Sequence, residues 1–140
     1  MQDFRRLRVW RKANALAIAV KRLTQSFPKT GYGSLRNQMT RSSESIPDNI
    51  AEGCGAATNP EFARFLDSSI KSTSELDSQL ERTHAYGLMG VMKYHWFATQ
   101  VQDVRKMTWS LRKKVLGAPP NVEADEETTR RRSGKKRQPG

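Results

Sequence analysis

The chain has 140 residues, of which 36% are hydrophobic and 28% are charged, and its formal net charge is +11. No apolar run approaches the roughly 20 residues that span a bilayer, which argues against a transmembrane helix. The single cysteine, Cys54, excludes an internal disulfide and a zinc site with several cysteines. We therefore expect one folded domain in the cytoplasm, without membrane contact and without a cofactor.

Apolar residues recur at alternating spacings of three and four along four stretches, and this period predicts helices. In chain order the stretches cover 9–27, 34–55, 58–83 and 91–116. Phe4 and Leu7 precede the first stretch and predict a short lead-in turn. The clearest helix start is Thr58-Asn-Pro-Glu61, which is typical of a capping box with proline in the first turn. Segments rich in glycine and proline separate the stretches.

Four helices of about 20 residues with short connections predict an all-α, antiparallel up-down four-helix bundle over residues 1–116. The remaining segment, 117–140, holds six basic and four acidic residues but few apolar ones, so we expect a disordered basic tail there. The first 116 residues keep 19 basic against 10 acidic residues, so most of the net charge belongs to the bundle. A surface of this sign attracts nucleic acid or acidic proteins.

The second and third predicted helices each carry a stripe of polar side chains beside the apolar one. The stripes contain Gln38, Arg41, Ser45, Asn49 and Glu52 on the second helix, and Ser72, Glu75 and Gln79 on the third. We predict that the stripes meet, with Arg41 pairing with Glu75 or Glu52. The contact forms either within one chain or between two chains, and the alternative is a solvated face.

Several short motifs resemble one protein family. They are Phe4-x-x-Leu-x-Val-Trp10, Phe27-Pro28, Gln38-x-x-Arg41, Ser45-Ile-Pro-x-Asn-Ile-Ala-Glu-Gly53 and Ser72-x-x-Glu75-Leu-x-x-Gln79-Leu80. Together they resemble the 23S rRNA intervening-sequence proteins over residues 4–116. The resemblance implies a four-helix bundle whose copies form a ring-like homo-oligomer, typically a pentamer, and it brings no established enzymatic activity. It also implies a shared architecture with the accessory proteins of diversity-generating retroelements, which bind nucleic acid and a reverse transcriptase.

The three tryptophans lie beside the apolar stripes and not within them. Trp10 belongs to the first predicted helix, and Trp96 and Trp109 lie on opposite sides of the fourth. A single bundle has little use for large apolar groups outside its core, so we predict that the tryptophans are buried against another copy of the chain. Platforms that stack unpaired bases are the alternative.

Basic residues gather at the start of the first predicted helix and along the fourth. The predicted nucleic-acid contacts are Arg5, Arg6, Arg8, Arg11, Lys12, Arg22, Arg105, Lys106, Arg112, Lys113 and Lys114. A ring repeats each patch, so modest contacts with phosphates would add up to strong binding of an RNA or DNA backbone. The alternative is a solvated exterior that only aids solubility.

The sequence offers no obvious catalytic set. Neither polar stripe contains a histidine, and the two histidines with the one cysteine lack metal-ligand spacing. We therefore predict a non-catalytic homo-oligomer, with five subunits favoured, that acts as a binding or scaffold module for nucleic acid. The alternative is a scaffold that binds only protein.

Overall fold

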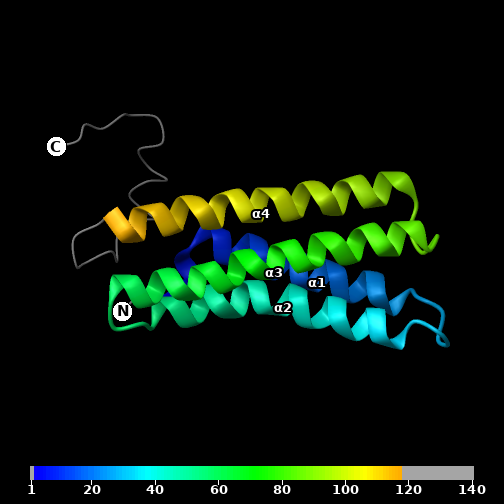
Figure 1. Ribbon diagram of the computed structural model, residues 1–140, viewed down its shortest axis with the longest axis horizontal. Helices are drawn as coiled ribbons and strands as arrows, with labels where there is room; N and C mark the ends of the chain where they lie inside the picture. Colours follow the sequence, from blue (N-terminus) through cyan, green and yellow to red (C-terminus); the bar gives the residue numbers. More distant parts are fainter. Residues whose placement is uncertain (1, 118–140) are drawn as a thin grey trace.

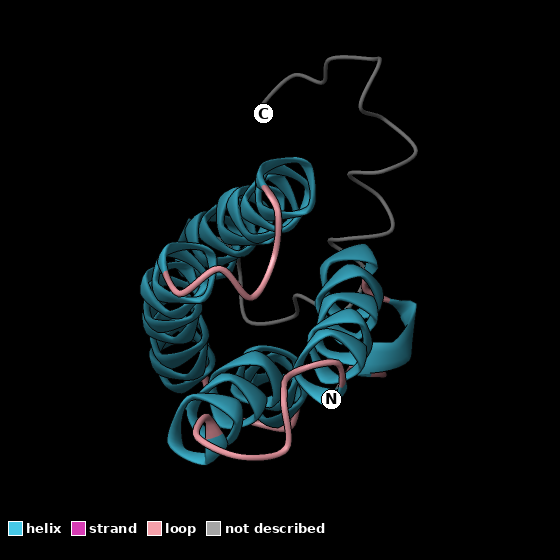
Figure 2. Cartoon of the chain, turned by 90° about the vertical axis from the view of Figure 1, so that its right-hand side faces the viewer, coloured by secondary structure: helices cyan, strands magenta, loops and turns pink. Residues whose placement is uncertain are grey.

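The computed structural model describes residues 2–117. Its elements are the 3-10 turn η1 (Phe4–Arg6) and the helices α1 (Arg8–Gln25), α2 (Gly33–Cys54), α3 (Asn59–Ala85) and α4 (Val91–Gly117). The long helices lie lengthwise beside one another (Figure 1), and the end-on view shows them around a shared centre (Figure 2). The predicted all-α, up-down four-helix bundle is confirmed. The tail predicted for 117–140 lies outside the described residues, except for Gly117 at the end of α4.

Local caps set the helix boundaries that the sequence indicates. Thr58 Oγ1 accepts the Glu61 N–H at 3.2 Å, so α3 begins at the predicted capping box. The Glu61 carboxylate accepts the Ala57 N–H at 3.3 Å and thereby closes the box one residue earlier than expected. Before α1, the Asp3 carboxylate accepts the Arg5 N–H at 3.1 Å and caps the predicted lead-in turn. This backbone hydrogen bond lowers the pKa of Asp3.

The core is a continuous set of apolar side chains, nearly all from the four predicted stripes. The largest fully buried ones are Leu7, Val9, Val20, Met39, Ile46, Ile50, Leu66, Leu76, Leu80, Val101, Val104 and Val115. Full burial of one such side chain contributes about 1.5–3 kcal/mol. The helices are therefore held together mainly by this shared core. Within the described range, no helix is long and apolar enough to form a membrane span.

Helices α2 and α3 pack closely because small residues lie between them. Ser69, which is fully buried on α3, donates from Oγ to the Ile46 carbonyl of α2 at 3.0 Å. Pro47 follows inside α2 and has no N–H, so the Ser43 carbonyl one turn earlier lacks its helical donor. At the end of the same contact, Gly53 lies directly against a phenylalanine ring of α3.

Replacing Gly53 by alanine should destabilise the bundle by about 1–3 kcal/mol, because the added methyl group would overpack the contact. A Cβ atom there would lie 2.6 Å from Cδ1 and 2.9 Å from Cε1 of Phe62, and 3.2 Å from Cβ of Phe65. Urea denaturation checks this, with Gly33→Ala as the matched control. Both variants replace a helical glycine by alanine, but a Cβ at Gly33 meets nothing within 4 Å. Equal midpoints would contradict the overpacking.

Candidate interaction surfaces

The polar stripes of α2 and α3 meet within one chain. The Ser72 hydroxyl donates to the Ser45 hydroxyl across the two helices at 2.8 Å. Asn49 donates from Nδ2 to Ser45 Oγ at 2.9 Å and to the Ser45 carbonyl at 2.8 Å. Ser72 is buried, whereas Ser45 and Asn49 are half-buried. The hydrogen bond between Ser72 and Ser45 therefore ties α2 to α3, and Asn49 supports it from within α2.

The charged members of the stripes lie outside this contact. Arg41, Glu52 and Glu75 are exposed, and within residues 2–117 none of them forms an ion pair. The predicted pairing of Arg41 with Glu75 or Glu52 is therefore absent within the chain. The register set by the serine contact brings Arg41 level with Glu75, but on the outer surface both charges keep their hydration and gain little from pairing.

The two glutamines of the stripes differ in their surroundings. Gln38 is exposed and donates from Nε2 to the Ser34 hydroxyl at 3.3 Å. Gln79 is half-buried, and its Oε1 atom is buried without a hydrogen-bond partner among the described residues. An acceptor in this state costs about 1–3 kcal/mol.

The three tryptophans have different neighbours. Trp10 packs on Phe4 with ring centroids 4.9 Å apart and contacts the core, so its apolar partner lies within the chain. Trp109 is 49% exposed, and the Arg112 guanidinium lies over its ring at 5.3 Å from the centroid. Trp96 is 50% exposed and makes an edge contact with Phe97 at 4.9 Å. Trp96 and Trp109 therefore keep large apolar surface available for a partner.

Trp96 lies in a groove between α1 and α4, which pack less closely than the other neighbouring helix pairs. The groove has a volume of about 650 Å³ and is lined by Ala19, Arg22, Leu23, Ser26, Met92, Lys93, Trp96 and Phe97. Met92 is 82% exposed at its rim. The small side chain of Ala19 leaves room between the helices. The result is an apolar groove flanked by two cationic side chains.

Some of the predicted nucleic-acid contacts are engaged with acidic residues of neighbouring helices. The pairs are Lys12 with Asp103 at 3.9 Å, Arg105 with Asp77 at 3.4 Å, and Arg112 with Asp67. Arg105 also donates to the Thr73 hydroxyl at 3.0 Å, and Lys12 to the Gln100 side-chain oxygen at 2.9 Å. These residues tie α4 to α1 and α3, so we assign them a structural role first.

The other predicted basic contacts remain accessible. Arg5, Arg6, Arg8, Arg11, Arg22, Lys106 and Lys113 are exposed, and Lys114 is half-buried. Arg5 pairs with Asp3 at 3.1 Å with its side chain 70% exposed, and a phosphate can replace so weak a partner. Arg11 donates to the Arg5 carbonyl at 2.9 Å, which leaves its charge uncompensated. Most of this set lies where α1 begins and α4 ends, whereas Arg22 lies toward the opposite end.

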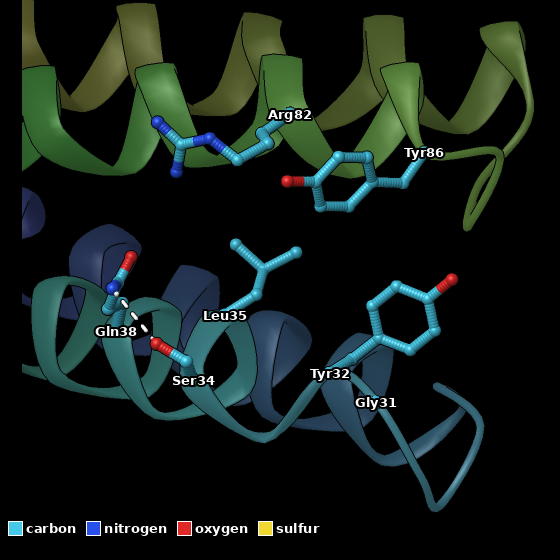
Figure 3. Close-up of a pocket in the computed structure, with 7 residues that line it drawn as sticks. All are labelled: Gly31, Tyr32, Ser34, Leu35, Gln38, Arg82 and Tyr86. Carbon is cyan, nitrogen blue, oxygen red and sulfur yellow. Dashed lines mark hydrogen bonds between the residues drawn. The ribbon is translucent and has the colours of Figure 1, made fainter.

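A pocket that the sequence analysis did not identify lies at that opposite end, between the start of α2 and the end of α3 (Figure 3). Its volume is about 640 Å³, and its lining consists of Gly31, Tyr32, Ser34, Leu35, Gln38, Arg82 and Tyr86. Of these residues only Gln38 belongs to a predicted site. Arg82 and Tyr86 are four residues apart and lie outside the apolar stripe, so they share one side of the helix. This spacing was the signal in the sequence that could have indicated the pocket.

Comparison with known proteins supports the family assignment. A family model described as 23S rRNA-intervening sequence protein matches residues 5–110. A crystal structure of a protein with unknown function from the S23 ribosomal protein family of Bacteroides thetaiotaomicron is similar, with a TM-score of 0.71 at 22% identity. The similarity covers 75% of this chain and 98% of that one, and at this identity it shows the fold alone. A search of functionally curated proteins finds no match. The resemblance seen in the sequence motifs is confirmed.

Proposed function

Because the chain belongs to the family of 23S rRNA-intervening sequence proteins, we propose that it is a non-catalytic module that assembles into a closed homo-oligomeric ring, with five subunits favoured, and binds nucleic acid by its backbone. The observation that carries the proposal is the set of exposed basic side chains on α1 and α4 that have no acidic partner. Arg8, Lys106 and Lys113 are examples within the described residues.

Two different faces of the bundle support the ring. The α1–α4 edge carries the groove with Trp96, whereas the α2–α3 edge carries the exposed charges of Arg41 and Glu75. Because the helices pack in the order α1, α2, α3, α4 around the bundle, these edges lie on opposite sides (Figure 2). Head-to-tail association joins two different faces of the subunit, and it closes into a ring when the rotation permits.

The charge of the bundle supports a polyanionic partner. Contacts with phosphate alone carry no sequence information but release counterions, so they confer affinity that depends strongly on salt. A ring repeats the basic set in every subunit, which multiplies modest individual contacts. The hydroxyls of Ser45 and Ser72 bond to each other, and that of Ser45 also accepts from Asn49. Neither bonds to a general base, which supports a binding role over a catalytic one.

The test is fluorescence anisotropy with hairpin RNA, single-stranded RNA and duplex DNA across a salt series. We expect the chain ending at Gly117 to bind, with a slope of log K against log salt of about −0.9 for each neutralised phosphate on duplex DNA. Arg8→Ala and Lys113→Ala should each reduce the magnitude of the slope by about one, because each variant removes a charge that we expect to neutralise one phosphate. Lys71→Ala, on the exposed side of α3, is the matched control and should leave the slope unchanged.

Two outcomes would overturn this assignment. If only the full chain bound nucleic acid, the contact with phosphate would belong to the segment after Gly117 and not to α1 and α4. Failure of every form to bind at about 50 mM salt, where phosphate contacts are strong, would remove the nucleic-acid function. A protein scaffold would then be the remaining function, and its binding to a partner should respond little to salt.

A further inference from the structure

We propose that the pocket between the start of α2 and the end of α3 binds one unpaired nucleotide of a single-stranded nucleic acid, with the base on the Tyr86 ring and the phosphate beside Arg82. The inference rests on the proposed nucleic-acid function. It adds a defined binding site and a class of ligand, single-stranded nucleic acid, to that function. A basic surface alone does not distinguish single strands from duplexes.

The two tyrosines form an aromatic platform at the open end of the pocket. Their ring centroids lie 6.1 Å apart with the planes tilted by 45°. Tyr32 is half-buried and is supported by an edge contact with the buried Phe27 ring at 6.4 Å. Tyr86 is 54% exposed, so its ring offers accessible surface to a planar ligand. Stacking on such a ring suits any nucleobase, because every base has a π-face.

Arg82 supplies the charge that a nucleotide needs. It precedes Tyr86 by four residues, which places the two side chains one helical turn apart, about 6 Å, on the same side of α3. Both lie along the side of α3 that faces α2, with the Tyr86 ring directed back toward Arg82 (Figure 3). Arg82 is exposed, forms no ion pair within residues 2–117, and no acidic residue lines the pocket. A guanidinium in this setting is suited to bidentate contact with a phosphate.

The remaining lining residues fit the base. Leu35 projects from α2 into the space between Arg82 and Tyr86, where it forms an apolar floor (Figure 3). Gln38 donates to the Ser34 hydroxyl at 3.3 Å, and its carboxamide oxygen is turned toward α3, where it can accept from a base edge. A volume of about 640 Å³ accommodates one nucleotide. Paired bases in a duplex are stacked and covered, so only an unpaired nucleotide reaches this platform.

The experiment uses the full chain and compares fluorescein-labelled oligouridylate with duplex RNA of the same length at one low salt concentration. Tyr86→Ala should weaken binding of oligouridylate roughly tenfold, because the base no longer has a ring to stack on. Arg82→Ala should weaken it by a similar factor. We expect both variants to bind the duplex within about twofold of the parent, and Tyr86→Phe to retain the stacking. Arg64→Ala removes one exposed charge at the far end of α3 and is the matched control.

Photocrosslinking with 4-thiouridine, mapped by mass spectrometry, should label Tyr86 or Tyr32 directly. Unchanged oligouridylate affinity in both alanine variants, alongside intact duplex binding, would overturn the pocket and leave the proposed backbone binding in place. Failure of the parent chain to bind any nucleic acid would overturn both. A lower sedimentation mass for Tyr86→Ala would identify the pocket as a contact between subunits, which would also overturn the nucleotide site.

Discussion

A chain in which Trp96 is replaced by arginine should sediment as a monomer of 15.9 kDa and should bind nucleic acid about a hundredfold more weakly than the parent chain. Trp96 is half exposed in the apolar groove between α1 and α4, next to the exposed Met92. An arginine there would place a third cation beside Arg22 and Lys93, and its burial in an interface would be unfavourable. The weaker binding is expected because a monomer presents one basic patch and does not have the avidity of the proposed ring.

Sedimentation velocity gives the mass, and anisotropy with duplex DNA gives the affinity. Ser78→Arg is the matched control, because it adds the same charge at an exposed position on α3, away from the α1–α4 groove. It should leave assembly and binding intact, and Trp96→Phe should retain the oligomer. Circular dichroism of each variant checks that the helices are formed. A Trp96→Arg chain with the parent's mass would show that the α1–α4 groove is not the contact between subunits.

The fold could be predicted because the burial of each helix follows from its own pattern of apolar residues. Leu76 and Leu80 lie four residues apart, Leu76 lies ten residues after Leu66, which is three plus four plus three, and all three are fully buried. The Thr58 cap marks the start of α3 by a contact with a residue three positions away, which a sequence pattern can show. Features with such local causes need no knowledge of the neighbouring helices.

The surface could be predicted only in part, because side-chain partners come from distant positions in the chain. Arg112 and Asp67 are 45 residues apart, and Lys12 and Gln100 are 88 apart. Nothing in the local sequence separates such engaged basic residues from accessible ones such as Lys113. The absent ion pair of Arg41 has the same origin, since periodicity gives the side of a helix but not the distance to a side chain on another.

The pocket at the end of α3 could not be predicted for the same reason, because its residues come from distant positions in the chain. Tyr32 comes from the connection before α2 and Tyr86 from the C-terminal cap of α3, so neither belongs to a periodic stripe. They meet because the antiparallel arrangement brings the start of α2 beside the end of α3. Sequence analysis assigned the aromatic role to the tryptophans instead, and one of these, Trp10, is satisfied by Phe4 within the chain.

The thiol of Cys54 should react with dithionitrobenzoate about a thousandfold more slowly in the native protein than in denaturant at pH 8. Burial, aided by the nearby Asp3 carboxylate, raises the pKa of Cys54 from 9.0 to about 12. Only the thiolate attacks the reagent, and at pH 8 its fraction falls from about one tenth to about one ten-thousandth. The side chain is 4% exposed, which slows the reaction further. The native rate should rise as the pH is raised from 8 toward the pKa of about 12, because deprotonation of Cys54 supplies the thiolate that attacks the reagent.

The chain has one cysteine, so absorbance of the released chromophore reports this position alone. A Cys54→Ala, Ala57→Cys chain is the matched control, since residue 57 is exposed in the connection between α2 and α3. Its native thiol should react at nearly the denatured rate. A native Cys54 that reacted within about tenfold of the denatured rate would have the accessible, low-pKa character of functional cysteines. That result would argue against the non-catalytic function, whereas the slow rate we expect is that of a thiol serving only as a small apolar group in the core.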